Sequence, residues 1–296
     1  MPSVLAIDLG GTKLTTAVVD QDGCVSGRIK RSSVRTGLGD SVEQIQSAIL
    51  ESLQASQTPE VQAIGLIVPG IFNRRTGEAW APNLWGHAHF PLLAELSGRL
   101  GWPITIESDR AGYVLGEQWL GAARGLRDVI FLAVGTGIGA GILSGGRLLH
   151  GSGSIAGAVG WFALSPVHRE AYEEMGCWEA EAAGPALARR LDLATAEDAI
   201  AAARRGDLAA IAAVEETACF LGLGIANLVS ILNPEMVVLG GGLMQSGDLF
   251  LPTIRRVLGK WAQPIAAQHV QIELTQLGED AGLLGAARLA LGSAEY

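Results

Sequence analysis

The sequence predicts an α/β protein made of two related domains, and three observations carry this prediction. First, an apolar run, a bend containing glycine and threonine, a second apolar run and a polar turn occur at residues 4–23 and again at residues 129–146. Second, strand-like and helix-like segments alternate between these two copies. Third, an alanine-rich, helix-like interval follows the second copy. Such alternation is typical of helices packed on a sheet.

Composition narrows the class of protein. The 296 residues are 49% hydrophobic, which suits one large or two medium domains. The net charge of −9, without a basic stripe, argues against nucleic acid and against an anionic membrane as partners. Cys24, Cys177 and Cys219 are scattered, which favours a reducing compartment over a disulfide framework. No signal-like segment precedes Val4, so we expect a soluble cytoplasmic protein, in which the apolar residues 218–232 form a buried helix.

Each copy of the repeat is predicted to be a hairpin whose bend binds phosphate. The bends are Gly10-Gly11-Thr12 and Gly135-Thr136-Gly137. Glycine lets the backbone turn tightly and present N–H groups to an anion, and threonine adds a hydroxyl donor. Two ordinary hairpins are the alternative, but the repetition favours two domains that hold one polyphosphate from opposite sides. The chain has no Walker-type Gly-x-x-x-x-Gly-Lys-Ser/Thr sequence, which excludes a P-loop.

Between the repeats, the pattern predicts a first helix after Asp40. Ser41 and Gln44 have the spacing of a capping box, and the apolar residues that follow fall on one helical face. The further elements expected in this half are a strand at 63–68, a helix at 92–100, a strand at 104–106 and a helix at 110–120.

After the second repeat, the pattern predicts helices at 179–191, 195–205 and 207–232, a strand at 236–239, a helix at 249–261, a strand at 270–274 and a closing helix at 281–291. We place the domain boundary between Leu115 and Gly125. The N-terminal α/β domain is then 1–118, with the closing segment 281–296 packed back on it. The larger C-terminal α/β domain is 119–280 and contains the helical insertion.

Two aspartates and one lysine are the candidate chemical groups of the first half. Asp8 ends a buried strand, where it either orients hydrated Mg²⁺ beside the phosphates or caps the Gly10-Gly11 turn. Lys13 either contacts phosphate or is solvated. Asp109 follows a strand and opens a helix, so it is either a base that accepts a hydroxyl proton or the N-cap of that helix.

A polar and aromatic loop, Pro82-Asn83-Leu84-Trp85-Gly86-His87-Ala88-His89, has no regular period. Its amide and rings suit recognition of a polyhydroxyl ligand, although surface loops often have this composition. His87 and His89 lack a third ligand nearby in sequence, so we expect them to be solvated rather than to bind metal.

The order of several segments resembles a known family, the ROK family of sugar kinases and sugar-responsive repressors in the hexokinase/actin-like ATPase superfamily. The segments are Asp8-Leu9-Gly10-Gly11-Thr12-Lys13, Val68-Pro69-Gly70, Pro82-Asn83-Leu84, Glu107-Ser108-Asp109, Gly135-Thr136-Gly137-Ile138-Gly139-Ala140-Gly141, Gly176-Cys177-Trp178-Glu179, Leu232-Asn233-Pro234-Glu235-Met236-Val237-Val238-Leu239-Gly240-Gly241-Gly242 and Ala281-Gly282-Leu283-Leu284-Gly285-Ala286-Ala287. The resemblance covers nearly the whole chain.

The resemblance implies a two-domain actin-like ATPase (ribonuclease H-like) fold, with ATP and a sugar in the interdomain cleft. It implies phosphoryl transfer from ATP, with Mg²⁺, to a primary hydroxyl of a hexose or hexose-like sugar. A non-catalytic sugar- or nucleotide-binding regulator of the same fold is the alternative. A homodimer is the expected assembly. The implied contacts are phosphates at Gly10, Gly11, Thr12, Thr136 and Gly137, adenosine at Gly240, Gly241 and Gly242, and sugar at Asn83, Asp109 and Glu179, with Asp109 as the base. Three residues of this chain are added as candidates from their positions beside these: Lys13 at the phosphates, and Ser108 and Trp161 at the sugar.

The chain also departs from the family. Where the family has Glu-x-Gly-His, this chain has Ala158-Val159-Gly160-Trp161, and the zinc knuckle is reduced to Gly176-Cys177. One thiolate does not build a tetrahedral zinc site, so no zinc is predicted and Cys177 is expected to be a buried apolar residue. Trp161, Phe162 and Trp178 are then candidates to hold the loop by packing. Trp161 either fills the volume left by the metal and histidine or stacks on a sugar ring.

Overall fold

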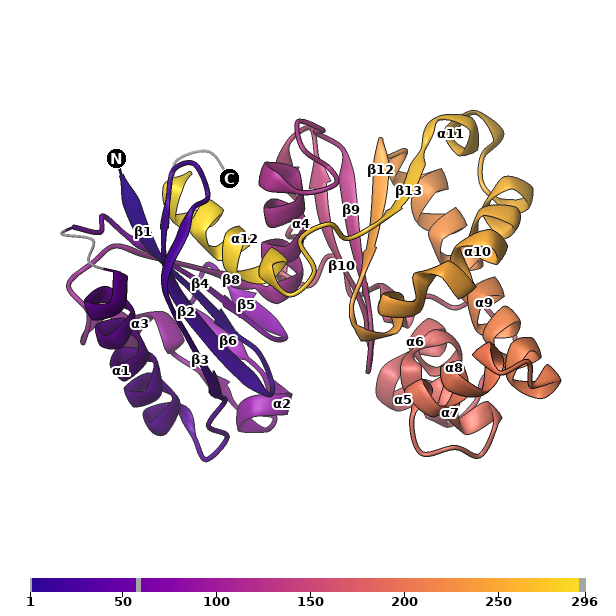
Figure 1. Ribbon diagram of the computed structural model, residues 1–296, viewed down its shortest axis with the longest axis horizontal. Coiled ribbons are helices and arrows are strands. Elements are labelled where there is room, and N and C mark those ends of the chain that lie inside the picture. Colours follow the sequence, from indigo (N-terminus) through magenta and orange to yellow (C-terminus); the bar gives the residue numbers. More distant parts are fainter. Residues whose placement is uncertain (1, 57–59, 293–296) are drawn as a thin grey trace. The chain divides into compact units, whose positions relative to one another are not determined.

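The computed structural model describes residues 2–56 and 60–292, so residues 293–296 of the predicted closing segment lie outside the described part (Figure 1). The chain forms two compact units. The first comprises Met1–Gly125, Arg147–Ile155 and Gln276–Tyr296, and the second comprises Leu126–Gly146 and Ala156–Thr275.

Each copy of the sequence repeat lies at the centre of a sheet with the same strand order. The first sheet has the order β3-β2-β1-β4-β8 and the second has the order β11-β10-β9-β12-β13. In the first, β1 pairs antiparallel with β2 and parallel with β4, and in the second, β9 pairs antiparallel with β10 and parallel with β12. The repeated hairpins are therefore β1–β2 and β9–β10, at equivalent positions of two similar sheets.

The strands are β1 Ser3–Leu9, β2 Lys13–Asp20, β3 Val25–Ser32, β4 Ile64–Val68, β8 Ile104–Ser108, β9 Val129–Val134, β10 Ile138–Ser144, β11 Arg147–Leu148, β12 Met236–Gly240 and β13 Gln271–Leu274. A small third sheet contains β5 Ile71–Asn73, β6 Glu78–Trp80 and β7 His89–Phe90. The α-helices are α1 Leu38–Ser56, α2 Pro82–Trp85, α3 Leu92–Ser97, α4 Asp109–Leu120, α5 Ala171–Met175, α6 Cys177–Ala182, α7 Gly184–Arg190, α8 Ala196–Arg204, α9 Leu208–Leu232, α10 Gly247–Trp261, α11 Pro264–His269 and α12 Asp280–Leu291, with short 3₁₀ helices η1 Val159–Trp161 and η2 Gly242–Ser246.

Two sequence predictions were wrong in detail. Ser41 is not an N-cap, because α1 begins at Leu38 and the Ser41 hydroxyl donates to the Gly37 carbonyl at 2.9 Å. The Gln44 amide instead donates to the carbonyl of Ser32 at 2.8 Å, which ties the helix to the end of β3. The helix predicted at 179–191 is broken at Ala183, which is extended, and Pro185 then lies in the first turn of α7.

Helix α9 is the core helix of the second unit. Among the described residues it alone has the length and hydropathy of a membrane span, and half of its most apolar window is buried within the protein. It packs against α10, α8 and α6, as the sequence prediction of a buried helix required.

In the first unit, α1 and α3 cover one face of the sheet while α4 and α12 lie on the other (Figure 1). Glycines bring α12 against its neighbours without intervening side chains. A Cβ atom on Gly285 would lie 1.8 Å from the Gly112 carbonyl of α4, and one on Gly65 of β4 would lie 1.8 Å from the Ala286 carbonyl. We call these contacts, at Gly65, Gly112 and Gly285, the glycine joint. The glycine joint fixes the position of α4 relative to the strands, and therefore the position of Asp109, the first residue of α4.

We predict that Gly285→Ala destabilises the protein by about 3 kcal/mol or more, because its methyl group has no room unless α4 and α12 separate. The matched control is Gly259→Ala in the exposed face of α10, where a Cβ meets nothing within 4 Å. That variant should gain roughly 0.5–1 kcal/mol from helix propensity alone. Urea denaturation of both variants checks the pair, and equal stabilities would contradict the glycine joint.

Candidate functional site

The β1–β2 turn presents backbone N–H groups that have no acceptor among the described residues. The carbonyls of Gly10 and Thr12 accept from Ser33, at 2.7 Å from its hydroxyl and 2.9 Å from its N–H. The Gly11 carbonyl accepts from Arg35 Nε at 2.8 Å. Within the part of the chain that the structure describes, nothing accepts from the N–H groups of Gly11 and Thr12. Carbonyls held on one side leave these donors for an anion on the other.

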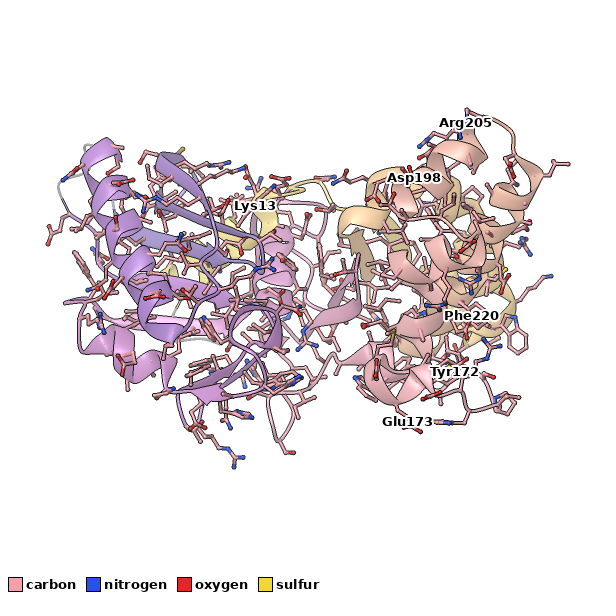
Figure 2. The ribbon with its side chains drawn as sticks, turned by 90° about the horizontal axis from the view of Figure 1, so that it is seen from below. Lys13, Tyr172, Glu173, Asp198, Arg205 and Phe220 are labelled. Atoms are coloured by element: carbon pink, nitrogen blue, oxygen red, sulfur yellow. The ribbon has the colours of Figure 1, made fainter. Side chains whose placement is uncertain are left out.

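Lys13 lies in an exposed ion pair. Its ammonium group is 3.5 Å from Glu279, and 65% of its side chain is exposed (Figure 2). The ammonium therefore contacts a carboxylate at the surface of the first unit.

The β9–β10 turn is held by Glu179, a residue that was predicted to bind sugar. Within the turn, Gly135 N–H donates to the Gly137 carbonyl at 3.0 Å. Glu179 Oε2 of α6 accepts from the Ile138 N–H at 2.7 Å, immediately after Thr136 and Gly137. Burial raises the pKa of Glu179, and the Ile138 N–H partly opposes this rise. The structure thus brings Glu179 to the second turn.

The glycine run after β12 packs against the end of β9. Gly241 has a φ of +92°, and a Cβ there would lie 2.4 Å from the Val134 carbonyl. A Cβ on Gly135 would lie 3.6 Å from the Gly242 nitrogen. A Cβ on Gly240 would lie 2.3 Å from the ring of Phe131. Only glycine allows this close approach, which sets the run beside the second turn.

Asp8 and Asp109 lie at the edge of the first sheet that is formed by the carboxyl ends of the parallel strands β1, β4 and β8. Asp8 is paired with Ile67 in the parallel strand β4, and Asp109 directly follows β8, the next strand in the order. Burial, and then the negative charge of Asp109, raise the pKa of Asp8 to about 7. Burial raises the pKa of Asp109 to about 6, against the opposing effect of the Arg110 cation. Perturbed carboxylates of this kind gather at functional sites.

The structural alternatives for both aspartates are not supported. The N-cap of α4 is Ser108, whose hydroxyl accepts from the Ala111 N–H at 3.4 Å, so the alternative interpretation of Asp109 as the cap was wrong. The Gly10 N–H donates to the Lys13 carbonyl at 2.8 Å. Among the described residues, Asp8 accepts no hydrogen bond from this turn, which it caps in the alternative interpretation.

Asn83 lies close to the first turn. The polar loop predicted at 82–89 contains the short helix α2, in which Asn83 is exposed. Its Cβ lies 3.6 Å from the position of a Cβ on Gly11. His87 and His89 are both exposed.

Trp161 does not fill a core volume. It ends η1 with 57% of its surface exposed, so the packing role expected for it was wrong. Trp178 is fully buried and stacks on Phe162 at 5.7 Å between ring centroids, which confirms these two as the packing residues. The exposed indole follows Gly160, where a Cβ would lie 3.0 Å from Glu179 Oε2.

The segment that carries a zinc knuckle in the family is held here by a buried carboxylate. Glu181 accepts from the Tyr172 hydroxyl, from Arg169 at 2.8 Å and from Arg190 at 3.2 Å. Arg190 also lies over the ring of Phe220, which Figure 2 labels with Tyr172. The sequence pattern gives no sign of this role for Glu181, because its partners lie in α5, in α7 and in the segment before α5. Cys177 is buried in an apolar cluster with Tyr172, and the described residues contain no group of three metal-ligating side chains.

Comparison with known proteins identifies relatives along the whole chain. The model of the ROK family matches residues 4–293. Glucokinase of Thermotoga maritima is 30% identical, with 97% of this chain and 96% of that protein covered. The crystal structure of a ROK hexokinase from Thermus thermophilus has a TM-score of 0.85 at 32% identity, with 98% of each chain covered. A ROK glucokinase from Streptomyces griseus, solved with glucose and AMPPNP, has a TM-score of 0.80 at 30% identity, with 98% and 99% covered. The predicted two-domain actin-like ATPase fold of the α/β class is thereby confirmed.

We predict that Glu181→Gln destabilises the second unit by about 3 kcal/mol, because two arginines and a phenol lose their shared anion. Glu173→Gln on the exposed face of α5 is the control and should change little. Thermal unfolding of both variants and of the wild type measures the difference.

We also predict that the protein contains no structural zinc. Thermal unfolding of the wild type with and without a chelator tests this, and a chelator that lowers the melting temperature would contradict it.

Proposed function

Because the chain belongs to the ROK family, we propose that it is an ATP-dependent sugar kinase that transfers the γ-phosphoryl group to a primary hydroxyl of a hexose or hexose-like sugar. The observation that carries the proposal is the edge of the first sheet. There, two carboxylates with raised pKa values stand at the ends of parallel strands, next to a turn with unused N–H donors. Phosphoryl transfer asks mainly for positioning, charge neutralisation and a base, and this edge offers all three.

The donor is proposed to bind through backbone groups. The N–H groups of Gly11 and Thr12, and the second turn at Thr136 and Gly137, would hold the phosphates, with Gly10 providing the bend. The run Gly240-Gly241-Gly242 would lie against adenosine, because the absence of side chains lets a flat ring approach the backbone. The exposed ion pair of Lys13 favours the solvated alternative for that residue.

The acceptor is proposed to bind beside Asp109, which would take the proton of the attacking hydroxyl. Its pKa of about 6 leaves it ionised at neutral pH yet more basic than an ordinary aspartate. Asn83 would hydrogen-bond sugar hydroxyls from its exposed position near Gly11. Glu179 would use the oxygen that does not accept from Ile138, and the exposed indole of Trp161 would stack on the sugar ring. Ser108 would act mainly by capping α4.

Mg²⁺ fits the residues present. Asp8 is a shielded carboxylate with a raised pKa, and no described lysine or arginine nitrogen lies within 4.0 Å of it. Mg²⁺ is typically held by one or two carboxylates together with substrate phosphates, and Asp8 would supply such a ligand, through water. When bound, the ion neutralises phosphate charge. Asp8 itself would orient the ion's hydration shell toward the first turn.

We further propose, from the family resemblance, a homodimer in the cytoplasm that binds neither nucleic acid nor membrane. The acidic composition supports the last two points. The N-terminal domain, 1–118 with the closing helix, would carry the base, and the C-terminal domain, 119–280, would carry the adenosine site.

The test of the function is ADP release with a panel of sugars at fixed Mg·ATP. We expect turnover with at least one hexose, and Asp109→Asn should lower kcat by about 10²–10⁴-fold while leaving the melting temperature equal or higher. Asp22→Asn, in the exposed turn after β2, is the control and should keep full activity. Tight sugar binding without ADP release would instead identify a non-catalytic regulator.

The pH dependence follows from the same pKa values. At saturating Mg·ATP, kcat/KM for the sugar should fall about tenfold per pH unit below the Asp109 pKa of about 6, rather than below about 4 as for an unshifted aspartate.

The contribution of Asp8 and Asp109 to folding stability depends on pH in the opposite direction. Between pH 7 and pH 4 the folded protein takes up protons at Asp8 and Asp109 that the unfolded chain does not, so acidification in this window favours folding at these groups. Parallel profiles of activity and urea midpoint check both directions.

A further inference from the structure

Arg110 lies next to the proposed base and reaches across the edge of the sheet. It is the second residue of α4, and its Nη2 donates to the Gly70 carbonyl at 3.2 Å. Gly70 follows β4, the strand that lies between β8 and β1 in the sheet. The guanidinium therefore extends from the end of β8, where Asp109 is, to the end of the neighbouring strand. Beyond that strand lies β1, which leads into the Gly10-Gly11-Thr12 turn.

The charge of Arg110 has no counterion within the described residues. Arg28, Arg204 and Arg256 each lie within 3 Å of a carboxylate, but no described carboxylate oxygen lies within 4.0 Å of the Arg110 guanidinium. Its side chain is half-buried, and only one of its five N–H donors is given to Gly70. A partly desolvated cation with unused donors lowers the stability of the folded protein, unless an anion pairs with it and accepts from these donors.

Three partners for this cation can be compared. Asp109 is close enough for Arg110 to lower its pKa, but the two side chains do not form an ion pair. A purely structural pin to Gly70 requires one donor and no charge. In the strand order β1-β4-β8, the Arg110 guanidinium lies between the proposed base, Asp109, and the proposed phosphate-binding turn. This position favours the phosphoryl group that is transferred from ATP to the acceptor as its anionic partner.

We propose that Arg110 is a catalytic residue that binds the phosphoryl group during transfer, through the N–H donors that it does not give to Gly70. This inference rests on the proposed kinase function. In the step, the acceptor oxygen forms a bond to the γ-phosphorus and the bond from that phosphorus to the β,γ-bridging oxygen breaks. The hydroxyl proton goes to Asp109, and the bond electrons leave with ADP.

An arginine suits this position for a physical reason. The transition state spreads negative charge over the three equatorial oxygens of the phosphoryl group, and a planar guanidinium matches two of them at once. The same cation lowers the pKa of Asp109 against the effect of burial, and so favours the ionised form of the adjacent base. One side chain would therefore stabilise the transferred group and also maintain the state of the base that starts the reaction.

The experiment compares Arg110→Ala and Arg110→Gln with wild type in steady-state ADP release. The glutamine variant is neutral but retains an amide donor for the Gly70 carbonyl, so it keeps the test valid if the alanine variant folds poorly. We expect kcat to fall by about 10²–10³-fold with less than a threefold change in KM for the sugar. Guanidinium ion added to Arg110→Ala should restore part of kcat. The acid limb of the pH profile should move to higher pH in Arg110→Gln, because the base loses its neighbouring cation.

The control is Arg99→Ala, which removes an exposed arginine paired with Glu95 and should leave kcat unchanged. An unchanged kcat in Arg110→Gln overturns the inference. So does an increase in KM for the sugar alone, which would make Arg110 an acceptor-binding residue, and so does a lost kcat with an unmoved acid limb and no rescue by guanidinium ion. Absence of ADP release by the wild type would overturn the kinase function and this inference together, so the two failures are distinguishable.

Discussion

The candidate site in the first unit depends on close backbone contact between α4, α12 and the strands of the first sheet. A Cβ on Gly282 would lie 2.4 Å from Asp8 Oδ2, and a Cβ on Gly112 would lie 2.7 Å from the side chain of Ile67. Gly285 closes the contact against the Gly112 carbonyl. Because packed interiors do not absorb such volumes, a side chain at Gly112 or Gly285 would displace α4, which begins at Asp109, and one at Gly282 would displace α12 from Asp8 of β1. The spacing of the two carboxylates is therefore set by residues that have no side chains.

The same packing explains the electrostatics. Helices that approach this closely exclude water from the carboxylates, and exclusion of water is the first cause of both raised pKa values. A shielded, like-charged pair lowers the stability of the folded state near neutral pH, and sites that perform acid–base chemistry commonly accept this cost. Arg110 offsets part of the cost at Asp109 without pairing with it. The cation and the acids thus form one electrostatic unit.

The sequence predicted what local pattern encodes. The repeated apolar runs and bends identified both hairpins, and the strand ends located Asp8 and Asp109. It did not predict features that arise only when separate elements of the fold come into contact. Glu181 binds Arg169, Tyr172 and Arg190 only once three helical segments meet. Trp161 was expected to fill the volume left by the metal and histidine, but its side chain is exposed, and Phe162 stacks on the buried Trp178 instead. Likewise, Arg110 has an ordinary place in a helix until β4 brings Gly70 to its guanidinium.

The proposed acceptor-binding residues of the two units differ in the contacts that they can make. With Ala158 and Trp161 where the family has glutamate and histidine, the sugar-side carboxylate left among the proposed residues of the second unit is Glu179, and one of its oxygens already accepts from Ile138. A site that binds a sugar hydroxyl through one carboxylate oxygen selects less strongly between sugars than a site that uses several partners. The reason is that a wrong sugar leaves fewer buried polar groups of the protein unpaired. The first unit, through Asn83 and Asp109, would then carry most of the hydrogen-bonding selectivity. The second would contribute an apolar surface at Trp161, which distinguishes a flat ring face rather than the direction of a hydroxyl.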